Sequence, residues 1–162
     1  MEPDRIFGDV ADLYDRRRPG YPESMIDAVL AAAPEPPWRI VESGAGTGIA
    51  TARFAARGAS IVAIEPDARM AERCRSRVAG AAGDVEVVVA HFEDAELEPG
   101  TFTIGLAAQS WHWVDQERGA AQMANALRPD GVLALTWNAP AVDRSTVRLA
   151  IEAAYARHVP SM

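Results

Sequence analysis

The sequence predicts an α/β fold, a doubly wound and mainly parallel sheet with helices on both faces. Short, continuous apolar runs alternate with amphipathic stretches along most of the chain. Strands that are apolar throughout are typical of parallel sheets buried on both faces. A glycine-rich loop at residues 42–48 also separates an apolar run from a helical stretch. Right-handed crossovers then place a ligand beyond the carboxyl ends of the strands.

The chain has 162 residues, of which 49% are hydrophobic and 24% are charged. This composition predicts a single globular domain, 1–162, with a sizeable core. We divide it into an N-terminal cap and helix (1–37), a Rossmann-like core (38–138) and a C-terminal helix (139–162).

Composition also excludes several classes of protein. Every basic residue is arginine, so no lysine is present for a Schiff base or a Walker-A loop. The net charge of −7 disfavours a nucleic-acid surface, and the lone Cys74 excludes an internal disulfide and a multi-cysteine metal site. No signal-like segment and no run near ~20 apolar residues occurs, so we expect a cytoplasmic protein without membrane contact and without a metal.

The first half alternates helix and strand. Pro22 suits the first turn of a helix, which the prolines at 34–37 stop. Strands are expected at 39–42 and 60–65, around a helix at 49–57 that Gly58 ends. The residues of that helix expected to face the core are Ile49, Ala52, Ala55 and Ala56.

The second half continues the alternation. Asp67 can cap a helix with Ala71, Cys74 and Val78 facing inward. Strands are expected at 85–89, 102–108 and 132–137, the last after a turn at 129–131. A helix at 116–127 has an expected core face of Ala120, Met123, Ala124 and Leu127. Asp143 opens a last helix, with Val147, Ile151, Ala154 and Tyr155 facing inward.

The loop between the first strand and its helix is the strongest functional signal. Glu42 ends the strand, and Gly44, Gly46 and Gly48 follow at alternate positions. Glycines allow positive φ and close approach of a ligand, and the helix behind them presents free N–H groups. The next strand ends in Glu65, where a ribose-binding acid is expected.

The same loop argues against a dinucleotide. A dinucleotide fingerprint places its third glycine three residues after the second, where this chain has Ile49. A diphosphate would also be repelled by Glu42. An acid at this position instead suits a positive amine beside a sugar, as in an amino acid joined to a nucleoside.

These motifs resemble those of the class I S-adenosylmethionine-dependent methyltransferases, in their small-molecule, type 11-like branch. Residues 42–48 match E/D-x-G-x-G-x-G, and 61–67 (IVAIEPD) match the second-strand motif. Residues 102–115 (FTIGLAAQSWHWVD), 127–138 (LRPDGVLALTWN) and 9–22 resemble further family segments. Thr103 departs from the usual aspartate, and we expect it to weaken a local hydrogen bond. The family core has two more strands, which are missing here.

The resemblance implies how S-adenosylmethionine would be held. Glu65 would accept hydrogen bonds from both ribose hydroxyls, or it would serve only as a buried structural carboxylate. Glu42 would orient the methionine amine. Phe92 would pack on the adenine or belong to the core. The role of His91, where the family often has aspartate, stays open. The residues that the resemblance places at the cofactor are Glu42, Gly44, Ala45, Gly46, Gly48, Glu65, Pro66, Phe92, Glu93, Ala108 and Gln109.

On the acceptor side, His112 is the candidate catalytic base, with shaping of the pocket rim as the alternative. Trp113 would lie beside it. Tyr14 and Arg18 would close over the cofactor or lie on the surface. These positions predict methyl transfer to a small molecule by in-line displacement.

Two other functions stay open, a non-catalytic cofactor-binding module and, more distantly, a nicotinamide-dependent oxidoreductase. The uncharged strand at 132–137 would form an edge, so it predicts a homo-oligomer paired through this strand.

Overall fold

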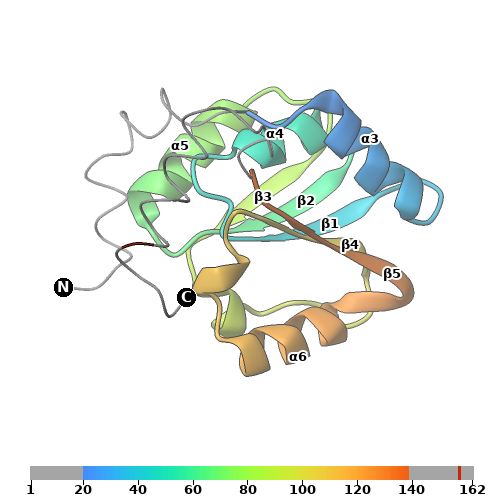
Figure 1. Cartoon of the computed structure of the whole chain (residues 1–162). Coiled ribbons are helices and arrows are strands. Elements are labelled where there is room, and N and C mark those ends of the chain that lie inside the picture. The colour runs from blue at the N-terminus through green and yellow to red at the C-terminus, as the bar shows by residue number, and fades with distance from the viewer. Residues whose placement is uncertain (1–19, 139–156, 158–162) are drawn as a thin grey trace.

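The computed structural model describes residues 20–138 and Arg157, and within them a five-stranded sheet of order β3-β2-β1-β4-β5 (Figure 1). All four strand pairs are parallel. The predicted doubly wound sheet is therefore confirmed. The predicted helix from Asp143 and the lid candidates Tyr14 and Arg18 lie outside the described residues.

The first half follows the predicted order, with ends that differ by a residue or two. Its elements are α3 (Glu23–Ala32), β1 (Arg39–Ser43), α4 (Ile49–Ala55), β2 (Ser60–Ile64) and α5 (Ala68–Val78). Pro22 stands at the N-cap of α3, and Gly58, at φ +81°, lies just past the end of α4. The Asp67 carboxylate accepts hydrogen bonds from the Arg69 and Met70 amides, so it caps α5 as predicted.

Between residues 85 and 136 the structure has three strands, two short 3-10 helices and one α-helix. These elements are β3 (Val85–Val88), η1 (Phe92–Asp94), β4 (Phe102–Ala108), η2 (Trp111–Trp113), α6 (Gln116–Ala126) and β5 (Leu127–Thr136). In Figure 1, α3, α4 and α5 cover one face of the sheet and α6 covers the other. Alternate residues of β1 serve the two faces: Ile40 packs with α3 and α4, whereas Val41 packs with α6.

The core faces predicted for two helices are confirmed only in part: Ile49, Ala52 and Ala55 near α4 and Met123 and Leu127 near α6 pack on the core as predicted, but other members of each face do not. In α4 the buried residues are Ala50, Thr51, Phe54 and Ala55, while Ala56 is exposed. In α6 they are Gly119, Met123 and Ala126, whereas Ala120 and Ala124 are exposed. Alanines occur all round both helices, so the larger Phe54 and Met123 select the buried face because they remove more apolar area from water.

β5 starts at Leu127, five residues earlier than predicted. It pairs with β4 at Phe102↔Leu127 and again at Ile104↔Val132, so β5 advances by five residues while β4 advances by two. The predicted turn Pro129-Asp130-Gly131 is therefore a bulge inside the strand, because proline cannot donate to the ladder. An ion pair between Arg128 and Asp130 closes it.

Thr103, where the resemblance leads us to expect aspartate, makes two hydrogen bonds to the first residue of β1. Its hydroxyl accepts a hydrogen bond from the Arg39 amide at 2.9 Å and donates one to the Arg39 carbonyl at 3.1 Å. The start of β1 is therefore tied to β4 by a side chain as well as by the ladder.

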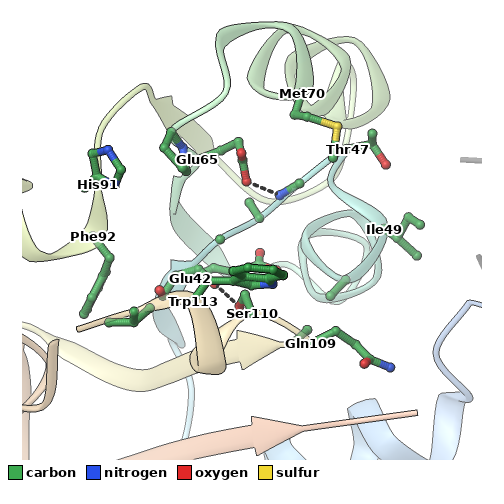
Figure 2. Close-up of a pocket in the computed structure, with 18 of the residues that line it drawn as sticks. Glu42, Thr47, Ile49, Glu65, Met70, His91, Phe92, Gln109, Ser110 and Trp113 are labelled. Carbon is green, nitrogen blue, oxygen red and sulfur yellow. Dashed lines mark hydrogen bonds between the residues drawn. The ribbon is translucent and has the colours of Figure 1, made fainter. Parts of the chain in front are cut away.

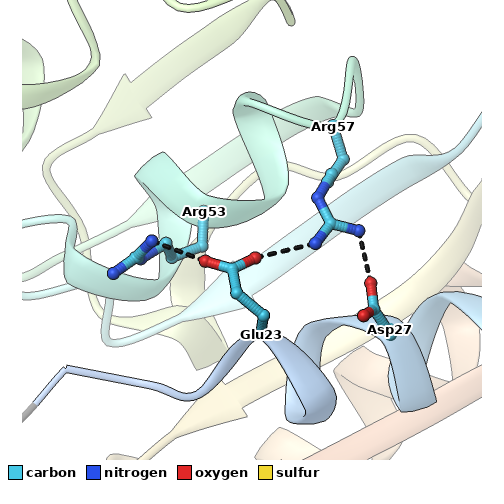
Figure 3. A network of polar contacts seen from close by, with 4 residues as sticks. All are labelled: Glu23, Asp27, Arg53 and Arg57. Atoms are coloured by element: carbon cyan, nitrogen blue, oxygen red, sulfur yellow. Dashed lines mark hydrogen bonds and ion pairs between the residues drawn. The ribbon is translucent and has the colours of Figure 1, made fainter.

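Charged side chains also join α3 to α4 (Figure 3). Glu23 contacts Arg53 at 2.6 Å and Arg57 at 2.7 Å, and Arg57 also pairs with Asp27. These side chains are about half exposed, so the network orients α3 more than it stabilises the fold. Across the described residues, we find no helix of the length and apolarity needed to cross a membrane.

Candidate functional site

A pocket lies beyond the carboxyl ends of β1, β2 and β4, and we call it the glycine-loop pocket (Figure 2). It contains eleven of the residues predicted for the site, from four separate segments of chain. These are Glu42, Gly44, Ala45, Gly46, Glu65, Pro66, Phe92, Glu93, Ala108, Gln109 and Trp113. Parallel strands end at a common edge, so residues far apart in sequence meet here.

All three glycines of the loop have positive φ, at +65° for Gly44, +60° for Gly46 and +80° for Gly48. Gly48 is the N-cap of α4 and is not a lining residue. A Cβ there would lie 2.7 Å from the Cys74 sulfur, and a Cβ at Gly44 would lie 2.5 Å from Ser110 Cβ. The outer glycines therefore let the loop pack on α5 and on the segment that follows β4.

Glu65 follows β2 directly and holds the glycine loop from the side. Its Oε2 accepts from the Gly46 amide at 2.8 Å, and its Oε1 accepts from the Asp67 amide at 3.0 Å. The side chain lines the pocket and is 8% exposed. It thus serves the structure and also lines the pocket, so the ribose-binding role stays a prediction.

Glu42 is more deeply buried, at 1% exposed, and also lines the pocket. The Thr51 hydroxyl donates to its Oε2 at 2.7 Å. Burial is the main reason that the pKa of Glu42 rises to about 7; the Thr51 hydrogen bond lowers it and the nearby Glu65 raises it further. A pocket carboxyl that is partly protonated near neutral pH is suited to a ligand that brings a positive charge.

η1 forms the wall after β3. Phe92 is 3% exposed, lines the pocket and meets Trp111 edge-on, with ring centroids 6.3 Å apart. It therefore belongs both to the core and to the wall. Glu93 is fixed because it accepts a hydrogen bond from the Asp115 amide. His91 also lines the pocket.

The end of β4 forms the opposite wall. Gln109 has φ +65°, a backbone that residues other than glycine rarely adopt, and its amide donates to the Thr136 carbonyl of β5 at 2.9 Å. Trp113 lines the pocket although it is 58% exposed. The neighbouring His112 is exposed, stands against Trp113 with ring centroids 5.0 Å apart and is not among the lining residues. The candidate base thus lies outside the pocket, because the single turn of η2 directs Trp113 inward in its place.

Eight lining residues were not predicted. They are Tyr21, Ser43, Thr47, Ile49, Ala50, Met70, Ser110 and Val114. Ser110 shows why they were missed: its hydroxyl donates to the Ser43 carbonyl across 67 positions of sequence. The only hint in the sequence was the small size of Ser110, since a residue packed against Gly44 must be small.

Comparison with known proteins places this fold and pocket in a recognised class. A family described as methyltransferase domain matches residues 41–135, which run from within β1 through the whole glycine loop to the end of β5 less its last residue. An uncharacterized methyltransferase of Mycobacterium tuberculosis is 37% identical over 132 residues, covering 82% of this chain and 51% of that protein.

Solved structures agree. A SAM-dependent methyltransferase from Thermotoga maritima superposes with a TM-score of 0.61 at 29% identity, covering 94% of this chain and 69% of that one. Geranyl diphosphate C-methyltransferase from Streptomyces coelicolor superposes with a TM-score of 0.62 at 21% identity. The match covers 82% of this chain and 49% of that one, and it shows the shared fold.

The chain therefore belongs to the methyltransferase domain family. It spans about half the length of the curated relatives it matches.

Proposed function

We propose that this chain binds S-adenosylmethionine and directs transfer of its methyl group to a small-molecule acceptor. The observation that carries the proposal is the pair of carboxylates Glu42 and Glu65, which flank one glycine loop within one pocket. A cationic amino acid joined to a nucleoside matches two acids in this arrangement. A dinucleotide, with its negative diphosphate beside Glu42, does not.

Each part of the pocket has a role in holding this cofactor. Glu65 uses one lone pair of each oxygen for the Gly46 and Asp67 amides, and a carboxylate oxygen has a second to accept a ribose hydroxyl. Glu42 faces the amine, and the loop backbone allows close approach. The ring of Phe92 is available to the adenine from the η1 side.

When bound, the cofactor supplies a methyl group on a sulfonium. The methyl carbon would be the electrophile for an acceptor lone pair, and the neutral thioether would be the leaving group. The leaving group needs no acid, so positioning can supply most of the catalysis. This agrees with a pocket from which His112 is absent, and we propose that His112 and Trp113 shape the acceptor rim.

The rim supports an acceptor that is small and partly apolar. Trp113 and Tyr21 both line the pocket, and no arginine is found among its described lining residues. The relative from Streptomyces coelicolor is named for a small-molecule acceptor, geranyl diphosphate. Aromatic side chains at the mouth can both contact such a molecule and exclude water from the reacting atoms.

Calorimetry with S-adenosylhomocysteine and with NAD tests the proposal. We expect micromolar binding of the first and no heat with the second. A micromolar response to NAD alone would support the oxidoreductase alternative and overturn the proposal. Binding without methyl transfer to any of a panel of small phenols, amines and prenyl compounds would leave the non-catalytic module as the function.

A further inference from the structure

A buried chain of polar groups lies beneath the glycine loop, and contact with the cofactor does not explain all of it. The Cys74 thiol, on α5, lies 3.8 Å from the Thr51 hydroxyl, on α4, and donates to it. That hydroxyl in turn donates to Glu42 at 2.7 Å. Thr51 and Cys74 are fully buried, so neither meets a ligand directly.

Among the groups that the structure describes, those acting on the ionisation of Glu42 are acids, and none is a base that would neutralise it. Across the described residues, the titratable groups that act on it are Glu65, at the end of β2, and the Cys74 thiol on α5. Burial and Glu42 raise the pKa of that thiol to about 11, so it stays neutral. The nearest compensation for a charge on Glu42 is therefore the Thr51 hydrogen bond.

A ligand ammonium would supply the missing positive charge. A carboxyl that is partly protonated in the free protein loses its proton when a cation arrives beside it, because the opposite charge favours the ionised form. Since the pKa of Glu42 is raised to about 7, this change falls within the physiological range.

We propose that binding of the amino-acid part of the cofactor is coupled to release of the Glu42 proton, and that Thr51 is the positioning residue that makes this release favourable. The inference rests on the proposed function. The Thr51 hydroxyl directs its only proton at Glu42, because it accepts from Cys74. Its donor is thus held ready for the ionised carboxylate, whereas the nucleoside part of the ligand brings no positive charge to Glu42.

Two ligands distinguish the amino-acid part of the cofactor, whose binding we expect to be coupled to proton release, from the nucleoside part, whose binding we expect to be uncoupled. S-adenosylhomocysteine carries the amino acid, whereas 5′-methylthioadenosine has the same nucleoside and sulfur without it. Between pH 5.5 and 7.5, we expect the affinity for S-adenosylhomocysteine to rise by about 20-fold in total, since linkage gives roughly tenfold per unit below the pKa. The affinity for methylthioadenosine should change by less than about twofold.

Calorimetry in buffers of different ionisation enthalpy counts the protons. Binding of S-adenosylhomocysteine should release close to one proton near pH 6 and about half a proton near pH 7. Methylthioadenosine should release none. In Glu42→Gln, both ligands should bind without proton release.

Thr51→Val keeps the shape of the side chain and removes the hydroxyl, and Thr51→Ser keeps the hydroxyl. At pH 7, Thr51→Val should weaken S-adenosylhomocysteine by about tenfold, as expected for a hydrogen bond to a charged group. It should also move the midpoint of the pH profile upward and leave methylthioadenosine unchanged. Thr51→Ser should restore both the affinity and the midpoint.

The outcomes separate the two proposals. If neither ligand binds, the proposed function fails and this inference fails with it. If both bind but the affinity for S-adenosylhomocysteine does not depend on pH, only this inference is overturned. Equal weakening of both ligands in Thr51→Val would show a merely structural role for Thr51. If Thr51→Val does not fold, the coupling is still tested by two measurements: proton release when the native chain binds S-adenosylhomocysteine, and the loss of that release in Glu42→Gln.

Discussion

The β1–β2 half of the sheet buries polar groups, whereas the β5 edge exposes apolar side chains. At the ends of β1 and β2, Glu42 and Glu65 are buried and held by hydrogen bonds. Along β5 the side chains are half-buried or exposed, and Leu133 and the following Trp137 are 44% and 50% exposed. The first half is shaped around a small ligand, whereas the second presents apolar surface. We therefore expect substitutions in the first half to change ligand affinity and those on β5 to change association.

The largest effect should come from Glu65→Ala. With the cofactor held as proposed, this change would remove two charge-assisted hydrogen bonds to the ribose, worth roughly 1.5–3 kcal/mol each. It also frees the Gly46 and Asp67 amides that Glu65 holds. Calorimetry with S-adenosylhomocysteine should show a loss of affinity of at least about a hundredfold. Glu86→Ala, an exposed glutamate on β3, is the control and should bind normally; equal affinities would place the ribose elsewhere.

Gly44→Ala should be next. The new Cβ would lie 2.5 Å from Ser110 Cβ at φ +65°, so we expect a loss of roughly 2–4 kcal/mol in the free energy of unfolding. Gly100 has a similar φ of +63° but open space around it, so Gly100→Ala should cost only about 1–2 kcal/mol. Urea unfolding measures both.

A rescue experiment sharpens this comparison. Adding Ser110→Gly to Gly44→Ala removes the clashing Cβ and should recover part of the lost stability. If the two glycine variants lose equal stability and the double variant recovers none, close packing between the loop and Ser110 is not the cause.

The third effect is a pH dependence of stability in the absence of ligand. The folded pKa of Glu42, about 7, lies above its ordinary value of 4.5. Between these values the folded chain binds more protons at this group than the unfolded chain does, so its contribution to stability falls as pH rises. We expect a loss of about 2 kcal/mol between pH 5.5 and 8.

Glu42→Gln supplies the reference for this measurement. The difference in unfolding free energy between the native chain and the variant removes the contributions of all other groups. That difference should decline with rising pH. A difference that stays constant would show that Glu42 titrates at its ordinary pKa.

Leu133→Lys should have the smallest effect on stability. This substitution tests the β5 edge. We expect the native chain to self-associate through residues 132–136 of β5, because an edge segment without charge pairs readily with another chain. A lysine at this exposed position should reduce association in light scattering and change the unfolding free energy by only about 0.5 kcal/mol. Val89→Lys places the same charge just after β3, at the opposite edge, where the residue is 46% exposed. A native chain that stays monomeric at high concentration would contradict the expectation.

The sequence by itself determined the strand order along the chain, the glycine loop and the two acids, because these depend on local signals. An apolar run, a glycine that permits positive φ and an aspartate at an N-cap each act within a few residues. Such signals placed β4 at its observed bounds, 102–108, and found Glu42, Gly46 and Glu65.

Only the tertiary structure decided which faces are buried and which neighbours tune the site. The bulge in β5 arises from its pairing with β4, and the faces of α4 and α6 depend on what the sheet offers to Phe54 and Met123. The partner of Glu42, Thr51, lies on the following helix, and its hydroxyl is directed by the way α4 packs against β1. The raised pKa of Glu42 is decided in the same way, because desolvation is a property of the packed site and leaves no pattern in the sequence.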